Sequence, residues 1–249
     1  PGIAPSLESR APPPPDAADR TVDIIASHYA RAAELAQELG RVPGVPLDVG
    51  ECAMPWIEEA AERAVTAMLP PVALSLQTSA LKLVGSESSR RRVDLLLARA
   101  ATAGQLRRLD LAESDVAEAP PLSAALGDRH AQAQAELVDG ELHLNSGDFD
   151  RAQELLEGAR DAFVALGDEA GEAESLRQIG MSHIFRGRNE DAERAVQAAL
   201  DRFRAVGDPR GEAWALQNRA WIASVQGRTS VAETIAPSPR STIRESAAS

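Results

Sequence analysis

The sequence predicts an all-α solenoid of antiparallel helix pairs, and the main evidence is a repeat of forty residues. Gly-Asp pairs recur at this spacing, at Gly127-Asp128, Gly167-Asp168 and Gly207-Asp208, and a second glycine series, Gly147, Gly187 and Gly227, falls midway between them. A fixed period of this size is typical of repeat proteins, in which each unit buries its apolar face against its neighbours. Apolar residues make up 44% of the chain and aromatic residues 3%. This composition favours closely packed helices rich in Ala, Leu and Val over a sheet.

Small residues recur in the same register. They form three columns: Ala112, Ala152, Ala192 and Ala232; Ala119, Ala159 and Ala199; Ala100, Gly140, Gly180 and Ala220. Small side chains are needed where helices nearly touch, so the columns mark helix contacts. Within one unit, Arg129–Asn145 is predicted to form one helix and Phe149–Leu166 the other, with Gly147 in the turn between them.

Upstream of the clear repeats, the helical signals are weaker. Helices are predicted over Thr21–Leu39, Met54–Met68 and Pro71 to Val84, and a loop over Arg41–Gly50. The predicted organisation is a disordered Pro-rich leader (1–20), a diverged helical region joining to an upstream domain (21–86), repeats (87–126, 127–166, 167–206 and an incomplete 207–236) and a disordered tail (237–249).

Two places depart from the repeat pattern. Pro120-Pro121 stands inside an expected second helix, and an interior proline costs about 3 kcal/mol, so we expect a broken helix near Ala119. Pro237 and Pro239 stop the last helix early. The last unit should then expose Ala213, Leu216, Ala220 and Val225, and a chain of this kind, a truncated or rearranged product, should self-associate through that face.

Charge and cysteine content exclude several classes of function. The formal net charge is −12, which argues against direct nucleic-acid binding because phosphates need a basic face. The single cysteine, Cys52, allows no disulfide framework, so an intracellular, cytoplasmic location is the simplest inference. We expect no membrane association, because no signal peptide and no apolar run of about 18 residues is present.

No catalytic, cofactor or metal site is expected. The only lysine, Lys82, follows no glycine-rich phosphate loop, and no nucleophile elbow or Cys-His pairing is present. His143 and His183 lie forty residues apart and would project alike, as a metal pair requires. The alternative is that both are half-buried packing residues, and we prefer it because no third ligand completes a site.

The middle unit resembles the tetratricopeptide repeat. Leu176, Ile179-Gly180 and His183 occupy the first-helix positions of that motif, while Ala192, Val196 and Ala199 occupy those of the second helix. The period is forty residues instead of 34, similar to the repeats of cell-polarity adaptors and large bacterial signalling proteins. The resemblance implies a right-handed superhelical solenoid.

The N-terminal part, with Ile25–Tyr29, Ala32-Ala33 and Trp56–Ala64, looks like the junction after the ATPase module of multidomain proteins from high-GC bacteria. These include class III adenylate or guanylate cyclases and LuxR-type regulators. This resemblance implies that the chain is the C-terminal part of such a protein, with the catalytic activity elsewhere.

In the resembling family, first-helix residues line a concave face that binds a protein or peptide. The positions that match are Gln134, Leu137, Glu141, Asn145, Glu174, Arg177, Met181, Ile184, Trp214, Gln217, Trp221 and Ser224. Trp214 and Trp221 lie on one helical stripe. They would either anchor a partner's apolar side chain or pack on a following helix.

The preferred hypothesis is therefore a noncatalytic scaffold for protein–protein interaction, coupled to an ATPase, cyclase or transcription-factor domain of a parental polypeptide. One alternative is a fragment of an adenylate/guanylate cyclase or of an ATP-binding LuxR-type regulator. Such a fragment would be assigned the activity of its parent although it lacks the catalytic residues. Another is a freestanding adaptor.

Overall fold

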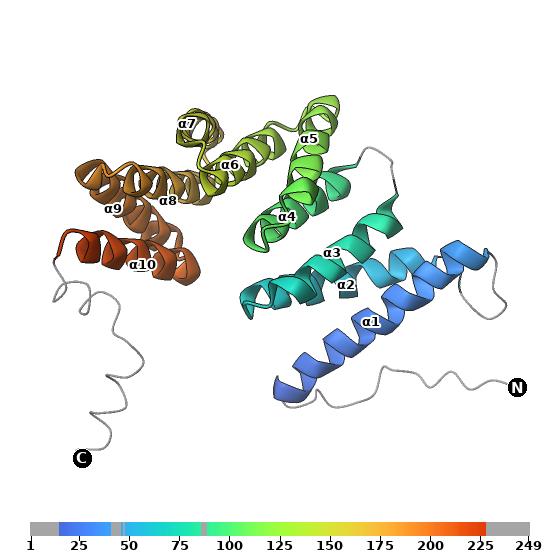
Figure 1. The fold of residues 1–249 in the computed structure, drawn as a ribbon. Coiled ribbons are helices and arrows are strands. Elements are labelled where there is room, and N and C mark those ends of the chain that lie inside the picture. Colours follow the sequence, from blue (N-terminus) through green and yellow to red (C-terminus); the bar gives the residue numbers. More distant parts are fainter. Residues whose placement is uncertain (1–14, 41–45, 47, 86–88, 228–249) are drawn as a thin grey trace, which may run out of the picture. The chain divides into compact units, whose positions relative to one another are not determined.

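The computed structural model describes residues 15–40, 46, 48–85 and 89–227, with backbone alone for residues 15–24 and 37. The described residues form ten helices and no strand, and within α1–α4 and within α5–α10 each helix packs on its neighbours in sequence (Figure 1). The prediction of an all-α solenoid of helix pairs is confirmed. The chain divides into two compact units, Pro1–Arg108 and Leu109–Ser249, which we call the N-terminal and C-terminal units.

The N-terminal unit contains α1 (Pro15–Leu39), α2 (Val49–Thr66), α3 (Pro70–Val84) and α4 (Arg90–Gln105). Helix α2 lies between α1 and α3, and α3 also contacts α4. Its core is aliphatic and consists mainly of Ala53, Ile57, Ala60, Ala73, Ala80, Val93 and Leu96. Helix α1 begins ahead of the predicted start at Thr21, and α2 begins ahead of the predicted start at Met54, inside the stretch predicted as a loop.

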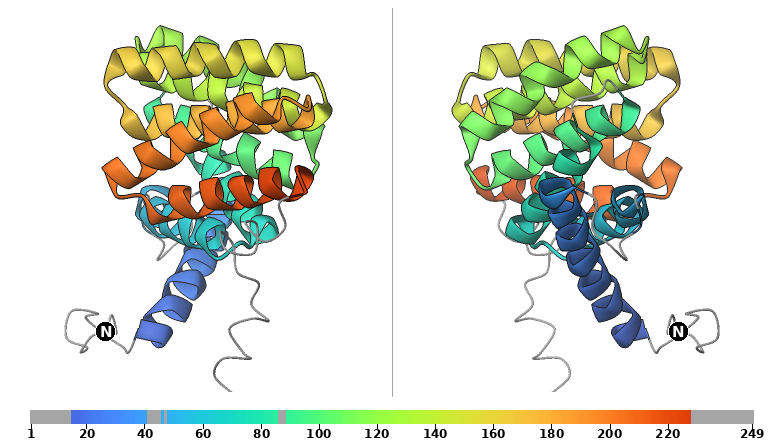
Figure 2. Two further views of the ribbon diagram at one scale, coloured as in Figure 1. Left: turned by 90° about the vertical axis from the view of Figure 1, so that its left-hand side faces the viewer. Right: turned by 90° about the vertical axis from the view of Figure 1, so that its right-hand side faces the viewer.

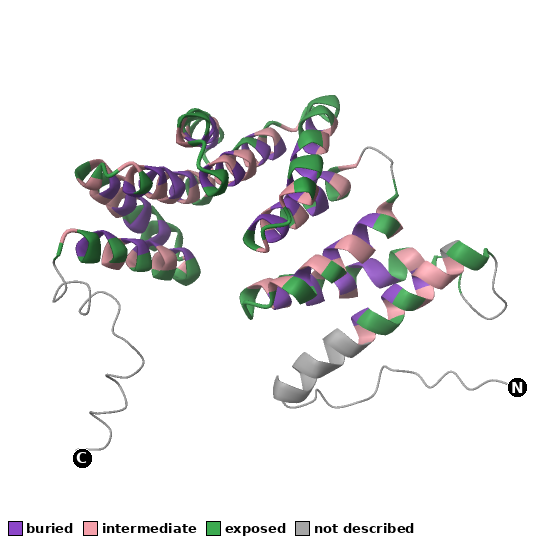
Figure 3. Cartoon of the chain, in the orientation of Figure 1, coloured by how far each residue is buried: buried purple, intermediate pink, exposed green. Residues whose placement is uncertain are grey.

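The C-terminal unit contains α5 (Leu109–Ala125), α6 (Arg129–Ser146), α7 (Phe149–Leu166), α8 (Glu169–Phe185), α9 (Asn189–Val206) and α10 (Pro209–Val225). Figure 2 shows α7 (yellow), α9 (orange) and α10 (red) stacked. Along each helix, buried positions alternate with exposed ones at helical spacing (Figure 3). The buried stripes face the neighbouring helices, which is how a repeat array makes one continuous core.

The repeated Gly-Asp pair joins one helix to the next. Gly167 ends α7 in the left-handed region at φ 72°, where glycine is favoured because it has no Cβ. The side chain of Asp168 then accepts hydrogen bonds from the backbone N–H groups of Ala170 (3.1 Å) and Gly171 (2.9 Å) at the start of α8. Asp128, Asp148 and Asp208 cap α6, α7 and α10 in the same way. A recurring sequence pair therefore encodes a recurring C-cap and N-cap.

Most members of the small-residue columns lie in the core as predicted, and Ala220 is half-buried. Ala112, Ala152, Ala192, Ala119, Ala159, Ala199 and Ala100 are fully buried. A Cβ placed on Gly140 would lie 2.8 Å from the side chain of Leu156, and one on Gly180 would overlap Val196. In these two pairs, α6–α7 and α8–α9, the helices thus approach closely enough to require glycine. The last member of the first column, Ala232, lies outside the described residues.

The predicted break near Ala119 is wrong, because α5 continues through Pro120 and Pro121 to Ala125. Both prolines are exposed, so their rings lie on the outer side of the helix and leave its packing face intact. The opposite face buries Val116, Ala119 and Ser123. Packing of that face against α6 outweighs the proline cost.

Candidate partner-binding face

In the C-terminal unit, the first helices of successive repeats contact one another. Helix α8 touches both α6 and α10, whereas the second helices α7 and α9 make no comparable contact. Helices that are closer together lie on the inside of a curved array, so α6, α8 and α10 form its inner side. We refer to the exposed and half-buried stripe along these three helices as the inner face.

The predicted site residues differ in how far they are exposed. Asn145, Gln217 and Ser224 are exposed, and Trp221 is 40% exposed. Gln134, Leu137, Glu141, Glu174, Arg177, Met181 and Trp214 are half-buried. Ile184 is a correction: it is buried in the core with Val196 and Ile222 and does not reach the inner face. Its neighbour Phe185 takes the position that follows Met181 by one helical turn.

Charged and amide groups form a network at the centre of the inner face. Arg177 donates hydrogen bonds from Nε and Nη2 to the two carboxylate oxygens of Glu174, at 2.8 and 2.5 Å. Gln178 donates a further hydrogen bond to Glu174 at 3.1 Å. The side chain of Arg177 is 14% exposed. Burial acts in the opposite direction, but the hydrogen bonds and charge of Glu174 raise the pKa of Arg177, so the guanidinium stays protonated and its hydrogen bonds to Glu174 are charge-assisted.

Glu141 of α6 adds a second carboxyl group to this network. Burial, and then the negative charge of Glu174, raise the pKa of Glu141 to about 7, although Arg177 and Gln178 act in the opposite direction. A carboxyl with this pKa is partly protonated near neutral pH. The site therefore holds two carboxyl groups that share one guanidinium.

Aromatic rings form a row that crosses three helices. Phe149 at the start of α7 stacks on Phe185 at the end of α8, with ring centroids 5.8 Å apart. Phe185 in turn meets Trp221 of α10 edge to face at 5.5 Å. Phe185 is 46% exposed. Sequence reasoning missed Phe149 and Phe185, although the spacing of four residues from Met181 to Phe185 was a usable signal.

Asn218 places a polar group beneath the same face. It precedes Trp221 by one helical turn and is 5% exposed. Its amide nitrogen has no hydrogen-bond partner among the described residues. Buried donors of this kind are normally paired with protein or with an ordered water.

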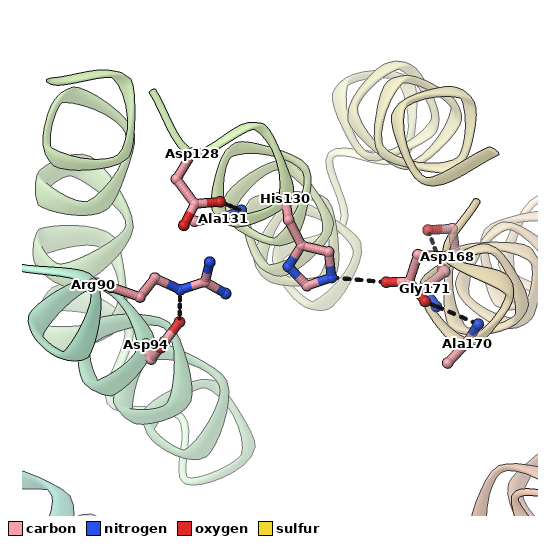
Figure 4. A network of polar contacts seen from close by, with 9 residues as sticks. Arg90, Asp94, Asp128, His130, Ala131, Asp168, Ala170 and Gly171 are labelled. Atoms are coloured by element: carbon pink, nitrogen blue, oxygen red, sulfur yellow. Dashed lines mark hydrogen bonds and ion pairs between the residues drawn. The ribbon is translucent and has the colours of Figure 1, made fainter. Parts of the chain in front are cut away.

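His143 and His183, the two histidines considered as a metal pair, are half-buried, as expected for packing residues. Burial lowers the pKa of His183. No group of three metal-ligating side chains occurs in the described part of the chain. A third histidine, His130, instead links two units, because its Nε2 lies 2.8 Å from Oδ2 of the α8 cap Asp168 (Figure 4).

In the N-terminal unit, a hollow lies between α1, α2, α3 and the start of α4. Its lining includes Asp48, Glu51, Met54, Ser89 and Arg91. Residues 41–45, 47 and 86–88 adjoin it in sequence and lie outside the described residues. We assign no function to this hollow. Among the described helices, none is long and apolar enough to span a bilayer.

Comparison with protein families identifies the repeat. Residues 133–205 and 171–236 match the model of the tetratricopeptide repeat. The chain carries a tetratricopeptide-repeat region. The sequence resemblance inferred from the middle unit is thereby confirmed. The predicted parent proteins, a cyclase–ATPase or a LuxR-type regulator, are not part of this finding.

Solved structures resemble the fold of the repeat protein. BtubC (BKLC) from P. vanneervenii is 18% identical with a TM-score of 0.58, over 86% of this chain and 88% of BtubC. The apo form of RapI is 13% identical with a TM-score of 0.55, over 92% of this chain and 65% of RapI. At these identities the likeness concerns the fold alone. No curated protein matches the chain.

Proposed function

We propose that the chain is a noncatalytic scaffold whose inner face binds a segment of a partner protein. The tetratricopeptide-repeat region supports this proposal, because such repeats generally mediate protein–protein interaction. The observation that carries it is the pair of large apolar side chains, Phe185 and Trp221, left 46% and 40% exposed on the inner side of the array. Exposed aromatic side chains beside ordered polar groups are typical anchors of protein interfaces.

The partner segment lies along α6, α8 and α10 in this proposal. Met181 and Trp214 provide further apolar surface, and Gln134, Asn145 and Gln217 provide hydrogen-bonding groups at the edges. The array would respond to the segment through small changes in its curvature.

A direct test compares two alanine variants, one at an exposed tryptophan of the inner face and one at an exposed valine of α7. Trp221→Ala removes the exposed ring from the inner face, and Val164→Ala removes a side chain that is 54% exposed on α7. We expect the first variant to lose binding to immobilised synthetic peptides by about tenfold or more, because interface tryptophans often contribute above 2 kcal/mol. The second should bind as the wild type does. Equal loss, or no loss, in both variants would rule out the inner face.

The parental context is a separate part of the proposal. We infer that the chain acts in the cytoplasm as the C-terminal part of a bacterial signalling protein of the cyclase or ATPase type. The support is the sequence resemblance of Ile25–Tyr29 and Trp56–Ala64 to the region after an ATPase module. A reading frame upstream of Pro1 that encodes no catalytic domain would favour the freestanding adaptor instead.

The second candidate is a fragment with residual nucleotide chemistry. Nucleotide turnover by the purified chain distinguishes it from the scaffold. The scaffold proposal predicts no rate above that of the buffer with ATP or GTP. A rate that is abolished by a single substitution in the chain would overturn it.

A further inference from the structure

We propose that residues 237–244 of the chain bind to its own inner face and compete there with a partner. These residues, which we call the internal ligand, belong to the stretch 228–249, outside the described residues. The inference rests on the proposed function, because it concerns the same face, and adds an intramolecular competitor to it. Three observations support it: the exposed aromatic side chains, the charge of the C-terminal unit and the length of the chain beyond α10.

The aromatic part of the inner face is open to water in the described part of the chain. Phe185 is 46% exposed and Trp221 is 40% exposed, and their rings meet edge to face at 5.5 Å. Covering such a surface with apolar groups is favourable. Proline suits aromatic surfaces, because its fixed backbone angle reduces the entropy lost on binding. The internal ligand contains Pro237, Pro239 and Ile243.

The charge of the C-terminal unit favours a basic ligand. Its described part, residues 109–227, contains 23 acidic residues against 11 arginines and no lysine. The internal ligand contains Arg240 and Arg244 and no acidic residue. Opposite charges of this kind attract a ligand to a surface and suppress wrong partners. The internal ligand therefore matches the face in charge as well as in apolar character.

The internal ligand is attached close to the surface that it covers. Trp221 precedes the last described residue, Gly227, by six residues. Residues 228–236 then connect α10 to the internal ligand, and nine residues extend to at most about 30 Å. A short connection of this kind holds a ligand at an effective concentration of about 1 mM.

This effective concentration makes weak binding sufficient. With a dissociation constant of about 0.1 mM, the occupied face would outnumber the free face by about ten to one. A partner must displace the internal ligand, so its apparent dissociation constant rises by about the same factor. The face is thus closed to weak partners and open to strong ones.

NMR spectroscopy tests the contact through the tryptophans of the chain, Trp56, Trp214 and Trp221, which give three indole N–H signals. The full chain carries Cys52→Ser, and a nitroxide spin label on Ser246→Cys reports proximity to the end of the internal ligand. Trp221→Phe assigns the Trp221 signal. Trp56, in the N-terminal unit, is the reference.

We expect the spin label to remove most of the Trp221 signal and to leave the reference signal. Arg240→Ser combined with Arg244→Ser should restore the Trp221 signal, because the attraction to the acidic unit is lost. Ala247→Glu combined with Ser249→Glu is the matched control. It lowers the net charge by the same amount outside the internal ligand and should leave the Trp221 signal attenuated.

Each of three results would overturn the contact. The Trp221 signal could be unaffected by the label, or its attenuation could persist in the variant with both Arg240→Ser and Arg244→Ser. The third is attenuation of Trp221 in an isotope-enriched chain without a label when a labelled chain is added. In that case the internal ligand of a second copy covers the face.

The immobilised synthetic peptides separate this inference from the proposed function. We expect the variant with Arg240→Ser and Arg244→Ser to bind them about tenfold more tightly than the wild type, because the competitor is gone. If Trp221→Ala loses binding while the double arginine variant binds as the wild type does, the internal ligand is wrong and the inner face stands. If no peptide binds even the double arginine variant, the proposed function is wrong.

Discussion

Gly171, at the start of α8, lies against the ring of Phe163 near the end of α7, so closely that a Cβ on Gly171 would overlap the ring. The same relationship joins Gly211 to Phe203 in the next unit. In the equivalent places of the preceding unit, Ser123 takes the place of phenylalanine and Ala131 that of glycine. A larger side chain on one helix is thus matched by a smaller one on the next. This contact sets how tightly one helix pair docks on the following pair.

Gly171→Ala should destabilise the protein by about 2 kcal/mol, because the buried ring of Phe163 has no space to shift. Chemical denaturation measures the change. Gly158→Ala is the matched control, since a Cβ there meets only the end of the flexible Glu136 side chain. That variant should be stabilised by about 0.5–1 kcal/mol, the gain from removing a helix glycine.

The Gly171→Ala effect should also depend on its partner. In the background of Phe163→Ser, which copies the preceding unit, Gly171→Ala should cost less than about 0.5 kcal/mol, because the clash is gone. Equal costs in both backgrounds would show that the ring is not the cause.

Arg107 adopts φ 57° in the turn between α4 and α5, where the later turns use Gly147, Gly187 and Gly227. The N–H of the following Arg108 bonds to the carbonyl of Ala103 at 2.9 Å, as that of Arg188 bonds to His183. An L-residue with a side chain is strained at this angle, so Arg107→Gly should stabilise the protein by about 1 kcal/mol. Gly187→Arg should destabilise it by a similar amount. Thermal melts of the two variants test both signs, and a stabilised Gly187→Arg would contradict the argument.

Glu141 should make stability depend on pH. Its pKa is raised from 4.5 to about 7 in the folded protein, so between these values the folded state binds more protons than the unfolded state. The contribution of Glu141 is fully present below pH 4.5 and is lost as pH rises through 7. The wild type should lose up to about 3 kcal/mol over this window from this group. In Glu141→Gln that loss should disappear, which denaturation curves at pH 5 and pH 8 would show.

Helix α10 contacts α8 and α9 among the described helices, and Val225 is 56% exposed at its end. We propose that this face mediates self-association. The double variant Leu216→Glu, Val225→Glu should then be monomeric under conditions where the wild type forms a dimer, because two charges cannot be buried unpaired. Sedimentation velocity distinguishes the species. A wild type that remains monomeric at all concentrations would remove this proposal.

The sequence alone determined the period, the helix pairs and most of the core. Gly167-Asp168 and its counterparts predicted the turns because left-handed C-caps and aspartate N-caps depend on local backbone chemistry. The alanine columns predicted the core because burial leaves a periodic record in the residues themselves. The proline argument at Pro120 failed where tertiary packing outweighed a local preference.

Only the tertiary structure decided how residues from different units combine. The pairing of Arg177 with Glu174 beside Glu141, and the row of Phe149, Phe185 and Trp221, join side chains from successive helices. Ile184 and Phe185 are adjacent, so which of them reaches the inner face depends on how α8 is rotated about its own axis. Packing against the neighbouring helices sets that rotation. Period and propensity are properties of one helix at a time, whereas charge balance and exposure arise only when helices are packed together.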